Sequence, residues 1–195
     1  MPTIRQRTLD ILDRDLSAEA SRHAGYPNDV RFRLLREVFS LDRTHWDKYY
    51  PLITKHSLTW NEFKYTDINR PDSLDKLIST NSIGLYLFVV RGINLFEDMP
   101  KYVFYVGMSG EDGSNRPLKD RLKDYFNLNE IKKRKKVHRM LQKYHPNVYV
   151  KYATTSMKHT ELEELEVNLH GFFHPIADER DFPVDIKHER QADLK

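Results

Sequence analysis

Cysteine is absent from this chain of 195 residues, and only seven residues are glycine. Without cysteine the protein forms no disulfide, no thiolate nucleophile and no cysteine zinc site, a composition typical of reducing compartments. Also absent is any apolar run of the roughly 18 residues that a membrane-spanning helix needs, and no apolar signal segment follows Met1. We therefore expect a cytoplasmic protein that does not enter a membrane.

The chain does contain enough apolar material for a core. Hydrophobic residues make up 39% of it and aromatic residues 12%, which predicts a folded globular protein. The net charge is only +3, but it is unevenly distributed: residues 116–143 hold eleven basic and three acidic side chains, whereas residues 160–195 hold four basic and ten acidic. Such neighbouring blocks are typical of a phosphate-binding surface beside a metal site. The alternative is that the basic run is a solvated helix face.

The first 80 residues have the pattern of helices. Apolar residues at helical spacing predict one helix over Thr3–His23, a second after Asn28 and a third that starts at Asp42 or Thr44. We treat residues 1–80 as an N-terminal helical region that either caps the rest of the protein or helps to select its target.

From Ser82 onward the pattern changes to strands rich in aromatic and β-branched residues. The expected elements are strands at 83–90, 101–107 and 147–153 and helices at 117–126, 130–144 and 160–173. Their order, β-β-α-α-β-α, predicts an α/β (α+β) fold with a small three-stranded antiparallel sheet flanked by helices. We assign this domain to residues 81–181 and a charged C-terminal tail to residues 182–195.

Two short triplets place glycine and tyrosine on the first two predicted strands, as Gly84-Leu85-Tyr86 and Tyr105-Val106-Gly107. Glycine permits a close approach of backbones, and neighbouring strands bring side chains together. Tyrosines in aromatic strands are more often core residues, so the triplets alone do not identify a site. Further signals follow in later helices: Arg121 and Tyr125 are four residues apart on one helical face, and Glu166 lies nine residues before Pro175.

In this order the residues resemble the GIY-YIG nuclease family, over about residues 82–181. The family pattern has a GIY triplet, a YIG triplet, an Arg followed four residues later by His or Tyr, a metal-binding Glu on a later helix, and an Asn shortly after a Pro. The resemblance implies a GIY-YIG-like fold and a divalent-metal-dependent endonuclease that hydrolyses phosphodiester bonds in DNA. It implies these catalytic residues: Tyr86, Tyr105, Arg121, Tyr125 and Glu166.

Four further residues are supporting candidates. Gly84 and Gly107 belong to the triplets, and Ser109 follows the second of them. Asp178 stands three residues after Pro175, where the family commonly has Asn. Either Asp178 takes the anchoring role, or Asn168 or another residue does, or the site is weakened.

Each candidate suits one part of phosphodiester hydrolysis. Glu166 offers a hard oxygen ligand for Mg²⁺ or Mn²⁺, and a single carboxylate with several retained waters is ordinary for Mg²⁺. Arg121 can make a bidentate contact with phosphate oxygens. Tyr86 is a general base only if its ionised form is favoured, since a free phenol titrates near pH ~10. Tyr105 would position water or phosphate, and Tyr125 would donate a hydrogen bond; which tyrosine takes the proton stays open.

DNA is the expected partner, with RNA as an open alternative. The residues expected to bind its backbone are Lys119, Lys123, Lys132, Lys133, Arg134, Lys135, Lys136 and Arg139. A single site cuts one strand at a time, so double-strand cleavage requires a homodimer or two successive events. A restriction or phage-defence nuclease is the favoured biological role, and a repair or mobile-element nuclease is the alternative.

Two other functions fit parts of the pattern. Glu166, His170 and His174 share one helical face, at spacings of four, and suggest a zinc site. A non-catalytic nucleic-acid-binding module with a decayed nuclease site would use the basic run for phosphates and aromatic side chains for stacking on bases.

Overall fold

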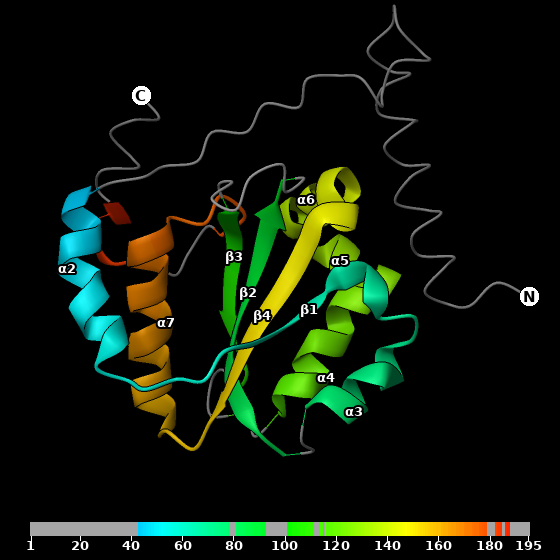
Figure 1. The fold of residues 1–195 in the computed structure, drawn as a ribbon, viewed down its shortest axis with the longest axis horizontal. Coiled ribbons are helices and arrows are strands. Elements are labelled where there is room, and N and C mark those ends of the chain that lie inside the picture. Colours follow the sequence, from blue (N-terminus) through cyan, green and yellow to red (C-terminus); the bar gives the residue numbers. More distant parts are fainter. Residues whose placement is uncertain are drawn as a thin grey trace, which may run out of the picture.

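The computed structural model describes residues 43–78, 81–92, 101–110, 114, 116–178, 182–184 and 186–187. The two helices predicted before Asp42 lie outside these residues. The described chain forms a mixed α/β structure with a four-stranded antiparallel sheet and six α-helices (Figure 1). The α-helices are α2 (Arg43–Thr54), α3 (Leu74–Leu77), α4 (Leu118–Lys123), α5 (Leu128–Lys133), α6 (Lys135–Tyr144) and α7 (His159–Phe173). The strands are β1 (Asn61–Lys64), β2 (Ile83–Arg91), β3 (Lys101–Met108) and β4 (Val148–Thr155).

Short 3₁₀ turns complete the chain, at Tyr65–Asp67, Pro71–Ser73, Asp124–Phe126 and His145–Asn147. None of the helices in the described part of the chain combines the length and the apolar character needed to cross a bilayer.

The expected three-stranded sheet is wrong, because a fourth strand lies at its edge. The strand order is β1-β4-β2-β3, and β1 pairs antiparallel with β4, where Phe63 faces Val150. Residues 61–64 had been expected in an all-helical region. The segment is only four residues long, too short for its alternation to stand out, and pairing with β4 fixes it as a strand. Its exposed Glu62 forms ion pairs with Lys151 on the neighbouring strand β4 and with Arg91 on β2.

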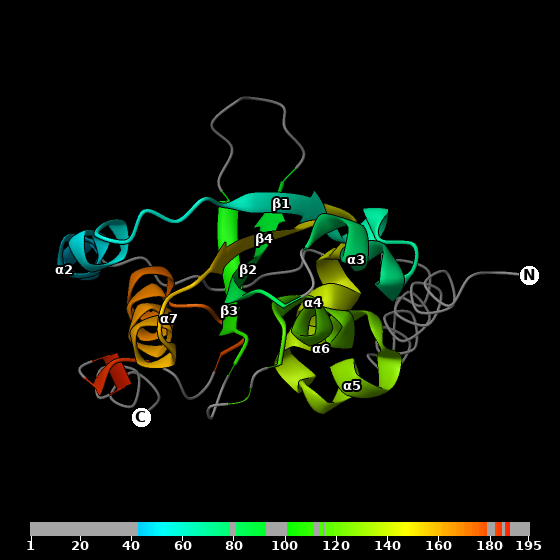
Figure 2. The ribbon, with the colours of Figure 1, turned by 90° about the horizontal axis from the view of Figure 1, so that it is seen from below.

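The other three predicted strands are present as β2, β3 and β4. Side chains of alternate residues point to opposite faces of the sheet, and each face is covered by different helices (Figure 2). One apolar cluster joins Tyr86 and Phe88 of β2 to α4, α5 and α6. The other joins Leu85 and Leu87 of β2 to Leu162 and further residues of α7. We call these two sides the α4–α6 face and the α7 face.

Helix α2 packs against α7 on the second of these faces. Its Tyr49 ring lies over Gly171 of α7, where an added Cβ would come within 2.6 Å of a ring carbon. Phe182 and Ile186 are buried beside Tyr49, so the segment expected to begin a charged tail starts with two apolar anchors. Part of the N-terminal region and the residues after α7 are therefore packed together.

Candidate active site

The two triplets meet across the pairing of β2 with β3. Tyr86 stands directly opposite Gly107, and a Cβ on Gly107 would lie 2.5 Å from the Tyr86 ring. The phenol therefore occupies the space that any larger residue at 107 would fill. At position 84 glycine is required by a backbone contact, since a Cβ there would lie 2.0 Å from the carbonyl oxygen of Ala153 on β4. Both glycines are required by packing at this end of the sheet.

A β-bulge decides where Tyr105 points. Phe88 pairs with Tyr105 but Val89 pairs with Val103, so β3 carries one extra residue, Phe104, at this point. Without the bulge, strict alternation from Val103, which lies on the α7 face, would place Tyr105 on that face too. With it, Tyr105 shares the α4–α6 face with Tyr86, and their ring centroids are 6.1 Å apart.

Three phenols converge on this face. The hydroxyls of Tyr86 and Tyr125 are hydrogen-bonded at 2.8 Å, and the rings of Tyr105 and Tyr125 are 5.8 Å apart. Tyr86 and Tyr125 are fully buried, whereas Tyr105 is partly exposed. Tyr105 is thus the least buried residue of the three.

Two arginines supply the cations of the cluster. Arg121, on α4, donates from Nε to the Tyr86 hydroxyl at 3.3 Å. Arg134 donates from Nη1 to the Tyr105 hydroxyl at 3.3 Å and also to the Tyr125 hydroxyl. Its guanidinium carbon lies 4.6 Å from the centre of the Tyr125 ring, a cation–π distance.

Arg134 had been expected within one continuous basic helix over 130–144 that contacts the nucleic-acid backbone. The structure divides that helix, because α5 ends at Lys133 and α6 begins at Lys135, with Arg134 between them at φ −103° and ψ 71°. The break directs Arg134 into the tyrosine cluster. No local pattern distinguishes Arg134 from the four lysines beside it, so its place could not be found from the sequence.

Asp124 supplies the negative charge beside these arginines. Its carboxylate accepts two hydrogen bonds from Arg116, at 2.9 and 2.7 Å, and lies 3.8 Å from Nη2 of Arg134. The hydrogen bonds from Arg116 to Asp124 raise the pKa of Arg116, against the effect of burial. Asp124 and Arg116 were not among the predicted site residues. Arg116 precedes α4 and Asp124 follows it, eight residues later.

Burial dominates the titration of the phenols. It raises the pKa of Tyr105 well above its ordinary value, with contributions of the same sign from Tyr86 and Asp178, while Arg134 and a hydrogen bond with Tyr125 lower it. Burial also raises the pKa of Tyr125, where Arg134 and Arg121 act in the opposite direction. Both phenols are neutral at neutral pH, and nearby positive charge is what favours their ionised forms.

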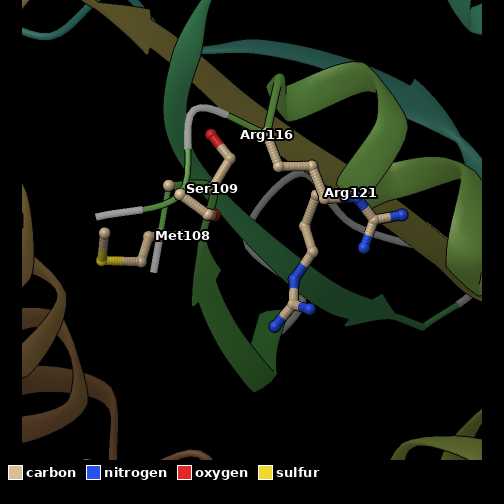
Figure 3. A pocket seen from close by; sticks show the side chains of 6 residues that line it. Met108, Ser109, Arg116 and Arg121 are labelled. Atoms are coloured by element: carbon tan, nitrogen blue, oxygen red, sulfur yellow. The ribbon is translucent and has the colours of Figure 1, made fainter. Parts of the chain in front are cut away.

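A small cavity of about 30 Å³ opens beside Arg121 at the end of β3. Met108 and Ser109 line one side of it and Arg116 and Arg121 the other (Figure 3). Ser109 is buried and ties the strand ends together, since its Oγ accepts from the Gly84 N–H at 2.9 Å. The predicted supporting residue Ser109 thus has a structural contact with the first triplet.

Glu166 comes from α7, on the opposite face of the sheet from α4. It is partly exposed, and its backbone carbonyl oxygen lies 2.8 Å from Nδ1 of His170. Nε2 of His170 lies 3.2 Å from the Asp178 carboxylate, which also accepts from the Val106 N–H at 2.9 Å. Asp178 therefore ties the second triplet to the helix that carries Glu166.

Asp178 favours the protonated form of His170. Burial alone would lower the pKa of His170, but the hydrogen bond with Asp178 and the charges of Asp178 and Glu166 outweigh burial and raise it. Asn168, the alternative anchor, is also buried in α7.

A zinc site receives no support from this geometry. Among the described residues, no three His, Cys, Asp or Glu side chains gather as a metal-binding group. His170 faces Asp178, and the His174 ring packs on that of His45 at 4.8 Å. A lone carboxylate such as Glu166 fits Mg²⁺ better, because Mg²⁺ keeps several waters and needs few protein ligands.

The predicted backbone-binding residues fall into two groups. Lys119 and Lys123 both pair with Asp75, at 3.3 and 2.9 Å, and so link α4 to α3. Lys133 pairs with Glu130 at 2.7 Å within α5. The exposed basic residues of α5 and α6, which we call the α5–α6 basic strip, are Lys132, Lys133, Lys135, Lys136 and Arg139.

Comparison with known proteins adds no relative. No protein-family model matches the chain. Nor does any curated protein or any solved structure match it significantly. The function must therefore be inferred from the site itself.

Proposed function

We propose that the protein is a divalent-metal-dependent endonuclease that hydrolyses phosphodiester bonds in DNA. The observation that carries this proposal is the convergence of three phenols and two guanidinium groups, from Tyr86, Tyr105, Tyr125, Arg121 and Arg134, at one end of the sheet. Phosphodiester hydrolysis needs cations around the phosphate and a group that takes a proton from water, and these side chains offer both.

The exposure of the phenols favours a division of roles. Tyr105 is partly exposed and is the phenol that takes a proton from the attacking water, whereas Tyr86 and Tyr125 are fully buried and hold the arginines and each other in place. Arg121, which contacts Tyr86, binds the scissile phosphate through its guanidinium group. This proposal assigns to Tyr105 the role of general base, which the sequence leaves open among the three tyrosines.

Glu166 is the residue that would hold Mg²⁺ or Mn²⁺, and the bound ion would supply charge stabilisation for the departing oxygen. Asp178 and His170 position the strand of Tyr105 relative to α7, which carries Glu166. The α5–α6 basic strip would contact the phosphates that flank the cut.

Cleavage of supercoiled plasmid tests this function. We expect nicked or linear product with Mg²⁺ or Mn²⁺, none with EDTA, and loss of product in Glu166→Gln and Tyr105→Phe. The matched control is Glu164→Gln, which changes an exposed carboxylate on the same helix that pairs with Lys55. Single-stranded DNA and RNA of the same sequence establish the preferred polymer.

Two outcomes contradict the proposal. If Glu166→Gln cuts as well as the wild type, Glu166 is not the metal ligand. If the wild type cuts nothing with any metal but binds DNA in a salt-dependent manner, the protein is a nucleic-acid-binding module, which would also rely on the α5–α6 basic strip.

A further inference from the structure

Arg134 contacts the most accessible phenol of the cluster. Its Nη1 lies 3.3 Å from the Tyr105 hydroxyl, and the same nitrogen contacts the Tyr125 hydroxyl. The break between α5 and α6 directs the side chain inward, and only 22% of its surface remains exposed. An arginine placed to bind a DNA backbone from a helix surface would instead project into solvent, as the lysines on either side do.

We propose that Arg134 is a positioning residue that holds the phenolic oxygen of Tyr105 and stabilises its negative charge. As a phenolate, Tyr105 accepts a proton from the attacking water. The water oxygen bonds to phosphorus as the bond from phosphorus to the leaving sugar oxygen breaks. A solvent proton is taken up by that oxygen, and Tyr105 returns its own proton to solvent. The role of Tyr105 in the cleavage reaction rests on the proposed nuclease function, whereas the effect of Arg134 on the charge of Tyr105 does not.

The groups that face Tyr105 come from four parts of the chain. Tyr86 lies on β2, Tyr125 follows α4, Arg134 lies between α5 and α6, and Asp178 follows α7. Of these four, Arg134 is the cation and Asp178 is the anion. Because Asp178 and Tyr86 disfavour a phenolate at Tyr105 and Tyr125 contributes only a hydrogen bond, Arg134 carries the favourable charge.

The position of Arg134 is itself held by the charged side chains of Asp124 and Arg116. The Asp124 carboxylate lies 3.8 Å from Nη2 of Arg134. Arg116 donates one hydrogen bond to each carboxylate oxygen of Asp124. Asp124 is mostly buried, with 15% of its side chain exposed. A planar guanidinium suits this place better than an ammonium group, because it reaches Tyr105 and Tyr125 on one side and Asp124 on the other.

Fluorine NMR of protein labelled with 3-fluorotyrosine measures the effect directly. Ring fluorination lowers phenol pKa values and brings ionisation into an accessible range, and Tyr105→Phe identifies the Tyr105 resonance. In Arg134→Gln we expect the pKa of the Tyr105 fluorophenol to rise by about 1 to 3, as for the loss of an opposite charge in contact. Arg134→Lys should restore part of the difference. Arg70→Gln is the matched control, since Arg70 is exposed and lies outside the site.

Activity provides the second measurement. The acid limb of the kcat profile should move to higher pH in Arg134→Gln, with kcat at neutral pH reduced about tenfold for each unit by which the Tyr105 pKa rises. If Arg134 instead binds DNA phosphates, KM and the salt dependence will change while the pH profile stays in place, which overturns the proposal. An unchanged Tyr105 titration in a folded Arg134→Gln protein overturns it whether or not the wild type cuts DNA. A wild type without nuclease activity contradicts the proposed function and leaves the titration to decide the role of Arg134.

Discussion

The two faces of the sheet are built from the same strands but differ in chemistry. On the α7 face, the apolar cluster of β2, β3 and α7 consists of aliphatic and thioether groups, including Leu87, Val106 and Leu162. On the α4–α6 face, buried phenols lie among apolar rings, and their hydroxyls are hydrogen-bonded to one another and to arginines. Burying polar groups costs stability unless they are paired. The phenols and arginines of the α4–α6 face are paired in this way, whereas the apolar cluster of the α7 face has no polar groups to pair.

The largest expected effect comes from truncating one buried leucine on each face. Both changes should lower stability, but the change on the α4–α6 face should lower cleavage more. Leu162 lies on the α7 face and Leu122 on the α4–α6 face, and both are fully buried. Truncation to alanine should lower the free energy of unfolding by about 2–5 kcal/mol in each case. Urea denaturation measures this loss. Cleavage measured where both variants are folded should fall much more in Leu122→Ala, since Leu122 adjoins Arg121; an equal loss would break the contrast.

Two glycines that accommodate tyrosine rings offer a closer comparison. Gly107→Ala places a Cβ 2.5 Å from the Tyr86 ring, and Gly171→Ala places one 2.6 Å from the Tyr49 ring. Overpacking should cost about 1–3 kcal/mol at Gly107. At Gly171 the cost should be smaller, because alanine is favoured over glycine in a helix by about 1 kcal/mol. Cleavage should be lost only in Gly107→Ala, and retained cleavage there would remove Tyr86 from the site.

Alkaline pH should act mainly through the α4–α6 face. Burial raises the pKa values of Tyr105 and Tyr125, so the unfolded chain releases these protons first, near pH ~10. Stability is therefore fully present below that pH and falls as the pH rises toward the folded-state pKa values, by up to about 1.4 kcal/mol per pH unit for each phenol. Urea midpoints between about pH 8 and pH 11 should decline less steeply in Tyr125→Phe than in the control Tyr50→Phe, whose ring is 59% exposed.

The smallest expected effect distinguishes two kinds of lysine beside the α4–α6 face. Lys135 belongs to the α5–α6 basic strip, whereas Lys119 is paired with Asp75. Lys135→Ala should weaken DNA binding similarly for all sequences and reduce the slope of log affinity against log salt by about 0.9. Lys119→Ala should reduce that slope by less. Equal changes in slope, measured by fluorescence anisotropy at several salt concentrations, would show that the ion pair with Asp75 opens to bind phosphate.

Much of the domain after Ser82 was predictable because its signals are local. Alternation and β-branched content mark β2, β3 and β4, and helical spacing marks α7, which ends just before Pro175. The triplet glycines indicated close backbone approach, which is what makes Gly84 necessary, whereas the close neighbour of Gly107 is the ring of Tyr86. The family resemblance implied a grouping of Tyr86, Tyr105, Tyr125 and Arg121, and these side chains lie together on the α4–α6 face.

The remaining features depend on contacts between distant parts of the chain. Strand β1 is set by pairing with β4, some 90 residues later, and four residues alone do not specify a strand. Lys119 and Lys123 are engaged by Asp75, a partner that no local pattern reveals.

By itself, the sequence determined the hydrophobic alternation of three strands, the small residues where they approach one another, and a supply of phenols and guanidinium groups. Tertiary structure alone decided which of these groups meet. The bulge at Phe104 directs Tyr105 to the face of Tyr86, and the break at Arg134 directs a cation to the same place. Both are single-residue irregularities whose cost is offset by packing and hydrogen bonds with distant residues, so only the folded chain stabilises them.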